Sequence, residues 1–156
     1  MLSSERTSLK ADMSETRTIR VMLVEDHIAF RQSLAFLLMR EPDLEVVAQA
    51  GSLAQARKML DTPLDVAVVD LGLPDGDGRD LIDELRRTNA GISVVVLSAT
   101  IAPENLEEVL KTGADALLHK VASPTTIVEE VRRLLDDKPQ ESTTTAYRGF
   151  SFQALG

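Results

Sequence analysis

The sequence contains no cysteine and no tryptophan, and only one tyrosine and four phenylalanines among its 156 residues. Without cysteine the chain has no disulfide framework, no thiolate zinc site and no cysteine nucleophile, which favours a cytoplasmic protein. A metal ion would have to be held by oxygen atoms or by the two histidines, His27 and His119. For these two, the sequence favours capping of a loop by His27 and completion of a strand edge by His119 over metal binding.

Long apolar runs and an excess of basic residues are also missing. No run approaches the roughly 20 apolar residues that span a bilayer, and residues 1–18 lack the apolar centre of a signal peptide. The 25 acidic and 17 basic residues give a net charge of −8. Nucleic acid and anionic membrane surfaces both need a positive partner face, so this balance argues against direct binding to either. The composition predicts a soluble, unexported protein with one domain of ordinary size.

Short apolar runs alternate along the chain with segments of helical periodicity. Strands separated by helix-length connections imply parallel pairing with right-handed crossovers. We therefore predict an α/β fold of the flavodoxin-like (βα)5 type, a doubly wound, parallel, five-stranded sheet with helices on both faces. The expected strands are residues 19–24, 44–50, 66–69, 92–97 and 116–119. The expected helices are residues 28–40 and 79–89 and three segments that begin near Ser52, Pro103 and Pro124.

Both ends of the chain fall outside this alternation. Residues 1–18 are polar and aperiodic, which predicts a disordered N-terminal tail. Residues 137–156 predict a flexible C-terminal tail or the remnant of a linker, although they contain Tyr147, Phe150 and Phe152. A hydrophobic hook that packs on this domain or on a partner is the alternative interpretation of these aromatics. The predicted domain covers residues 19–136.

Polar residues that carry chemistry follow four of the five expected strands. Asp70 ends the apolar run of residues 66–69 and is followed at once by a loop rich in proline, glycine and aspartate. In a parallel sheet the carboxyl ends of the strands form a common rim, so these residues are expected to converge there. They are Glu25 and Asp26, Asp70, Ser98 and Lys120.

This constellation resembles the response-regulator receiver domain of two-component systems over residues 20–136. Within that family the chain is most similar to the receivers of LuxR-type helix-turn-helix transcription factors, because Val-Ala-Ser-Pro, and not proline directly, follows Lys120. The resemblance rests on the acid pair Glu25–Asp26, the sequence Val-Asp-Leu-Gly-Leu-Pro around Asp70, the later Asp77–Gly78, the pair Ser98–Ala99, and Gly-Ala-Asp at residues 113–115 ahead of Lys120.

The resemblance implies that Asp70 accepts a phosphoryl group from a phosphohistidine on a sensor histidine kinase. Hard oxygen ligands are what Mg²⁺ prefers, so Asp26, Asp70, the carbonyl of Gly72 and, directly or through water, Glu25 form the expected metal site. The ammonium of Lys120 is expected to hold phosphoryl oxygens. Such a chain is a signalling switch and not an enzyme, beyond self-phosphorylation from small donors and slow self-dephosphorylation.

The switch positions implied by the resemblance are Ser98 and Leu117. A phosphoryl group at Asp70 would draw the Ser98 hydroxyl inward and bias the following loop and helix between two arrangements. Many receivers have an aromatic residue three positions before the lysine, where this chain has Leu117, so the usual tyrosine or phenylalanine rotamer change does not operate here. The expected output is a changed surface, with homodimerisation as one form of it.

Other functions fit the same fold class less well. A flavin site would need a phosphate-binding loop after the first strand, and the acids Glu25 and Asp26 would repel a phosphate. An aspartyl phosphatase would need a second acid two positions after Asp70, where Gly72 stands. Two alternatives stay open within the family. The chain is either the receiver part of a DNA-binding transcriptional regulator, without a basic recognition helix after residue 136, or a pseudo-receiver that acts as a binding module.

Overall fold

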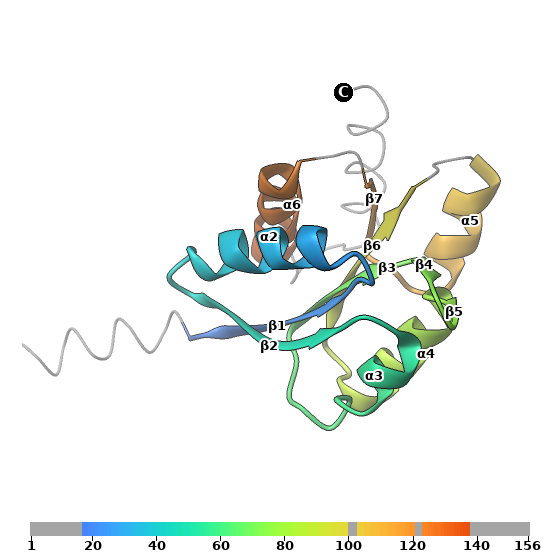
Figure 1. Cartoon of the computed structure of the whole chain (residues 1–156), viewed down its shortest axis with the longest axis horizontal. Coiled ribbons are helices and arrows are strands. Elements are labelled where there is room, and N and C mark those ends of the chain that lie inside the picture. Colours follow the sequence, from blue (N-terminus) through green and yellow to red (C-terminus); the bar gives the residue numbers. More distant parts are fainter. Residues whose placement is uncertain (1–16, 100–102, 121–122, 138–156) are drawn as a thin grey trace, which may run out of the picture.

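Five parallel strands form the centre of the fold (Figure 1), in the spatial order β2-β1-β3-β6-β7. The structure is a computed structural model that describes residues 17–99, 103–120 and 123–137, so almost all of the two predicted tails lies outside the described residues. This order confirms the predicted doubly wound sheet, and its winding direction reverses between β1 and β3. The strands are β1 Ile19–Val24, β2 Leu44–Ala50, β3 Val66–Asp70, β6 Ser93–Ser98 and β7 Ala116–His119.

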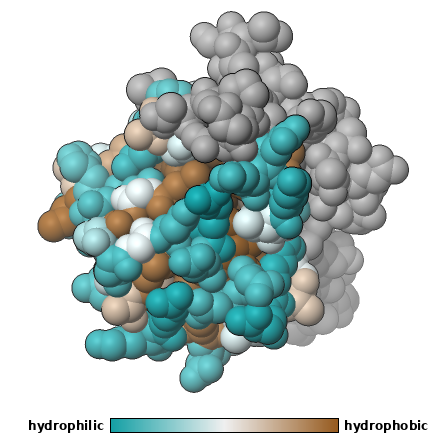
Figure 2. All heavy atoms as spheres, turned by 90° about the vertical axis from the view of Figure 1, so that its right-hand side faces the viewer, coloured by the Kyte–Doolittle hydropathy of each residue, from teal (hydrophilic) through white to brown (hydrophobic). Residues whose placement is uncertain are grey.

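Helices cover both faces of the sheet (Figure 1). On one face α2 (Ile28–Met39) and α6 (Pro124–Asp137) bury a stripe of leucine, isoleucine and valine. The other face carries α3 (Leu53–Arg57), α4 (Arg79–Thr88) and α5 (Pro103–Lys111). The side of the molecule with α5, turned toward the viewer in Figure 2, presents mainly hydrophilic side chains with hydrophobic ones between them. Among the described residues no helix has the length and apolar character needed to cross a membrane.

Within the described part of the chain, side-chain hydrogen bonds cap the first turns of α2, α3 and α6. His27, which was expected to cap a loop, is the N-cap of α2, where its Nδ1 accepts a hydrogen bond from the Phe30 N–H at 3.3 Å. At α3 the Ser52 hydroxyl accepts the Gln55 N–H at 3.1 Å, which is one half of a capping box. The Gln55 amide oxygen, however, accepts from Gly51 and not from Ser52. The third cap is at α6, where the Ser123 hydroxyl accepts the Thr126 N–H.

A small antiparallel hairpin follows β3, where the sequence predicted only a loop. It pairs β4 (Gly72–Leu73) with β5 (Gly76–Asp77). Strands of two residues have no periodicity, so a pattern-based prediction cannot find them. Between them Asp75 accepts the N–H groups of Leu53 and Ala54 at 2.8 and 3.0 Å, and these bonds hold the pKa of its carboxyl below the usual value. The hairpin is thereby tied to the first turn of α3.

Arg132 joins α6 to the turn between α2 and β2. Its guanidinium donates to both carboxylate oxygens of Asp43, at 2.6 and 2.7 Å, and to Glu41 at 2.9 Å. Paired, charge-assisted hydrogen bonds of this kind fix orientation as well as distance. Arg132 therefore fastens α6 to the beginning of the edge strand β2.

Replacing Arg132 with alanine should lower the free energy of unfolding by about 1 to 2 kcal/mol, because Asp43 and Glu41 lose charge-assisted hydrogen bonds. Urea denaturation of the variant measures this loss. The matched control is Arg87→Ala, which removes an exposed pair with Asp83 one turn away on α4 and should cost less than about 0.5 kcal/mol. Equal losses of unfolding free energy in the two variants would show that the ion pairs of Arg132 contribute no more than an exposed surface pair.

The same ion pair predicts a pH dependence. The hydrogen bond from Arg132 holds the pKa of Asp43 below its usual value of 3.8, in spite of partial burial. Because the folded pKa is the lower one, the stabilisation is complete above the unfolded pKa and is lost as the pH falls through the folded one. The difference in unfolding free energy between the native chain and Arg132→Ala should therefore be constant between about pH 5 and 7 and shrink below about pH 4. A difference that grows on acidification would contradict this assignment.

Candidate functional site

The predicted strand-end residues meet at one edge of the sheet. Backbone hydrogen bonds continue past the ends of the strands: the Leu71 N–H donates to the Leu97 carbonyl at 2.9 Å, and the Lys120 N–H donates to the Ser98 carbonyl at 2.8 Å. These bonds hold the residues after β3 and β7 in line with the sheet. Ser98 is itself the last residue of β6, which begins and ends one residue later than predicted.

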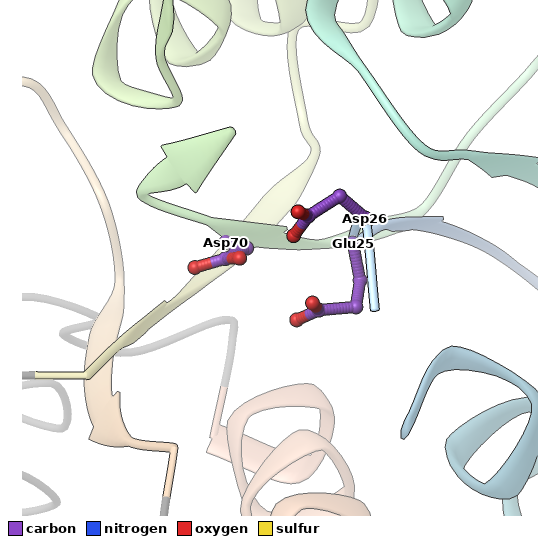
Figure 3. Close-up of side chains that lie close together, drawn as sticks. All are labelled: Glu25, Asp26 and Asp70. Carbon is purple, nitrogen blue, oxygen red and sulfur yellow. The ribbon is translucent and has the colours of Figure 1, made fainter. Parts of the chain in front are cut away.

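Three carboxylates lie together at this edge. One oxygen each from Glu25, Asp26 and Asp70 falls within 4.8 Å of the others. Figure 3 shows the carboxyl groups of Glu25 and Asp26 turned toward the side on which Asp70 lies. Glu25 and Asp70 are only 2% and 3% exposed, whereas Asp26 is open to solvent. Two of the three charges are therefore removed from water and repel each other at short range.

Lys120 is the cation that faces the two buried acids. Its Nζ lies 2.9 Å from Glu25 Oε2 and 3.2 Å from Asp70 Oδ2. It also lies 5.6 Å from the centre of the Phe30 ring of α2, in cation–π range. Burial would lower the pKa of Lys120, but the hydrogen bond to Glu25 and the charge of Asp70 outweigh burial and raise it. The lysine is therefore charged at neutral pH.

The donor set fits a hard divalent cation. Glu25 Oε2 accepts from Lys120 and from the His27 N–H at 2.9 Å, but Glu25 Oε1 is buried and has no hydrogen-bond partner among the described residues. Burial also raises the pKa of Glu25, and the charge of Asp70 raises it further, against the lowering by His27 and Lys120. An unpaired, buried carboxylate oxygen beside two further carboxylates supplies only oxygen ligands, which suits Mg²⁺ or Ca²⁺.

A cavity of about 370 Å³ opens at this edge and is called the site cavity below. Gly72 lines it, and its N–H donates to Asp70 Oδ1 at 3.2 Å. The proposed switch residue Ser98 also lines it and is 6% exposed. Leu117 is fully buried in the hydrophobic core that β7 shares with α4 and α5. The residues that line the site cavity are Asp26, Asp70, Leu71, Gly72, Asp77, Arg79, Ser98, Ala99, Val109 and Lys120.

Sequence reasoning missed two arginines at this edge. Arg79, the first residue of α4, lines the site cavity, where its Nε donates to Asp77 Oδ2 at 2.8 Å. Arg31 of α2 donates to the Glu25 carbonyl at 2.6 Å and so holds the end of β1. Neither arginine stands at a strand end, which was the signal used for the other residues. Asp77 was part of the resemblance but was given no role.

Comparison with known families supports the geometry. The profile of the response regulator receiver domain matches residues 21–132. The chain belongs to this family. Over 121 residues this receiver chain is 31% identical to the nitrate/nitrite response regulator protein NarP of Escherichia coli (strain K12), covering 77% of the chain and 56% of NarP. It is 36% identical over 114 residues to the transcriptional regulatory protein UhpA of Salmonella typhimurium (strain LT2), covering 72% of the chain and 57% of UhpA. It thus spans somewhat over half the length of these relatives.

Solved structures agree with the fold. The signal receiver domain of the putative response regulator NarL from Mycobacterium tuberculosis superposes with a TM-score of 0.69 at 27% identity, over 80% of this receiver chain and 99% of that one. A two-component response regulator of the LuxR family from Aurantimonas sp. SI85-9A1 gives a TM-score of 0.71 at 24% identity, over 89% and 99% of the two chains. These neighbours confirm the predicted fold.

Two glycines of the segment after β3 should respond differently to alanine. A Cβ at Gly78 would lie 2.3 Å from the carbonyl oxygen of Asp70, whereas a Cβ at Gly72 would meet nothing within 4 Å. Gly78→Ala should therefore lower the free energy of unfolding by about 1 to 3 kcal/mol, as overpacking does. Gly72→Ala is the matched control and should stay within about 0.5 kcal/mol of the native chain. Thermal or urea denaturation compares them, and an unchanged Gly78→Ala variant would contradict the close approach.

Proposed function

We propose that this receiver accepts a phosphoryl group on Asp70 from the phosphohistidine of a sensor histidine kinase, with Mg²⁺, and then changes conformation or association to control an output. The observation that supports this is the convergence of Asp26, Asp70 and Lys120 at one cavity, with the buried Glu25 beside them. Membership of the receiver family supports the same role. A phosphoacceptor of this kind is a signalling switch, and the cytoplasm is its expected location.

The reaction needs little covalent chemistry from the protein. A carboxylate oxygen of Asp70 attacks the phosphorus in line as the bond from phosphorus to the kinase histidine nitrogen breaks. The electron pair of that bond stays on the imidazole, which takes up a proton, and the product is an acyl phosphate. Lys120 already lies 3.2 Å from Asp70 Oδ2, so its charge is in place for the oxygens of the incoming group.

The carboxylates of Glu25, Asp26 and Asp70 and the carbonyl of Gly72 would hold the metal. Mg²⁺ held there would neutralise negative charge on the phosphoryl oxygens as Asp70 attacks. The buried Glu25 Oε1, which has no other partner among the described residues, is the oxygen with most to gain from a cation. Glu25 acts directly or through a bound water.

The phosphorylated state differs from the free state in charge at the end of β3. A dianionic group on Asp70 is a strong acceptor, and Ser98 lines the same cavity at the end of β6. Movement of Ser98 would shift the balance between two arrangements of the segment that leads into α5. Leu117 offers only a buried aliphatic side chain at the second switch position, so its part is limited to packing. Homodimerisation through a changed helical surface is one form of output.

A second candidate concerns the whole protein. The relatives NarP and UhpA are described as a response regulator and a transcriptional regulatory protein, and this chain covers 56% and 57% of their lengths. This coverage supports a role as the receiver part of a DNA-binding transcriptional regulator. With a net charge of −8, the chain itself is not expected to bind nucleic acid.

Intact-mass analysis after incubation with acetyl phosphate tests the proposal. The native chain should gain one phosphoryl group in the presence of Mg²⁺ and none after chelation, because the metal offsets the repulsion between Asp70 and the donor. Asp70→Asn should gain none, and Lys120→Ala should gain it about 100-fold more slowly. The exposed Asp83→Asn is the control and should behave as the native chain.

The oligomeric size of the labelled chain, measured in the same samples, identifies an association-based output. If the native chain binds Mg²⁺ but gains no phosphoryl group, the phosphoacceptor proposal fails. A pseudo-receiver that binds its partner constitutively then becomes the better account.

A further inference from the structure

Arg79 is a second cation in the wall of the site cavity. The nitrogen atoms of its guanidinium contact two different acids. Its Nε donates to Asp77 Oδ2 at 2.8 Å, and its Nη2 contacts the same oxygen. The remaining nitrogen, Nη1, pairs with Glu108 of α5. Asp77 therefore holds the arginine at the cavity, while Nη1 forms an ion pair with a residue of α5.

The partner element α5 forms part of the same cavity. Val109, next to Glu108, is fully buried and lines the cavity wall. The ion pair between Arg79 and Glu108 thus connects the first turn of α4 to the helix whose position shapes the cavity. The two acids raise the pKa of Arg79, so the guanidinium keeps its charge throughout the neutral range.

Glu108 and a phosphoryl group on Asp70 would differ in how strongly they pair with Nη1 of Arg79. The Glu108 side chain is 58% exposed, and ion pairs with exposed carboxylates are weak and easily replaced by water. A phosphoryl dianion inside the cavity offers three strong acceptor oxygens and a second charge. A guanidinium held at the cavity by Asp77 is therefore better paired with that dianion than with Glu108.

We infer that the Arg79–Glu108 ion pair couples the charge on Asp70 to the position of α5. In the free protein the pair holds α5 against α4. Once Asp70 carries a phosphoryl group, Nη1 of Arg79 exchanges Glu108 for a phosphoryl oxygen, and α5 is released. This inference rests on the proposed phosphorylation of Asp70, and it assigns the release of α5 to two residues outside the acid cluster and Lys120.

Hydrogen–deuterium exchange of the backbone amides of α5, residues 103–111, tests the coupling before and after acetyl phosphate and Mg²⁺. Glu108→Gln and Arg79→Gln each remove the pair with little change in shape. In the unphosphorylated variants we expect exchange of α5 to be about two- to fivefold faster than in the native chain, close to the native phosphorylated level. Phosphorylation should then add little further change. Glu107→Gln, the neighbouring exposed acid on the same helix, is the matched control and should leave both states as in the native chain.

Intact mass, recorded on the same samples, separates this inference from the phosphorylation on which it rests. A native chain that gains no phosphoryl group overturns the proposed function and, with it, the release step. A native chain that gains the group normally, with α5 exchange in Glu108→Gln and Arg79→Gln unchanged from the native values in both states, overturns the coupling alone. Faster exchange in Glu107→Gln equal to that in Glu108→Gln also overturns it, because general loss of acidic charge would then be the cause.

Discussion

The repulsion among Glu25, Asp26 and Asp70, offset by the single ammonium of Lys120, is the constraint on which this structure depends. Two of these carboxylates are almost fully buried, which is costly unless opposite charge is close. Lys120 supplies that charge at 2.9 and 3.2 Å, yet it leaves the three acids with an excess of negative charge. The site is consequently stable enough to form and still favours a further cation.

The surrounding fold holds this unfavourable group together. The strands β1, β3, β6 and β7 pair in parallel and bring their ends to one edge, which no helix packing alone would fix. Apolar side chains on both faces anchor these strands. The free energy gained by burying them offsets the unfavourable free energy of burying the charged groups. Contacts at the edge then refine the arrangement, such as the bond from Arg31 to the Glu25 carbonyl.

The sequence was most informative where burial decides the structure. Apolar runs such as residues 66–69 and 92–97 predicted the strands, and a parallel sheet left only one edge for their polar ends. The β4–β5 hairpin was missed because two-residue strands carry no period. Helix α3 ends at Arg57, although the apolar spacing of the sequence continues to Leu60. The ion pair between Arg79 and Glu108 could not be predicted from the sequence. It joins two different helices, α4 and α5, and neither residue type nor spacing indicates such a contact.

The distribution of charge also limits how the switch can work. Leu117 is fully buried among other aliphatic side chains, so this residue has no polar group whose hydrogen-bond partner could change. The polar groups that could respond to a new charge at Asp70 line the cavity instead, at the ends of β6 and β7 and on α4. Packed aliphatic cores resist small changes in shape, whereas ion pairs near the surface rearrange at little cost. A phosphoryl group on Asp70 would therefore act through side chains at the rim while the core of the sheet stays as it is.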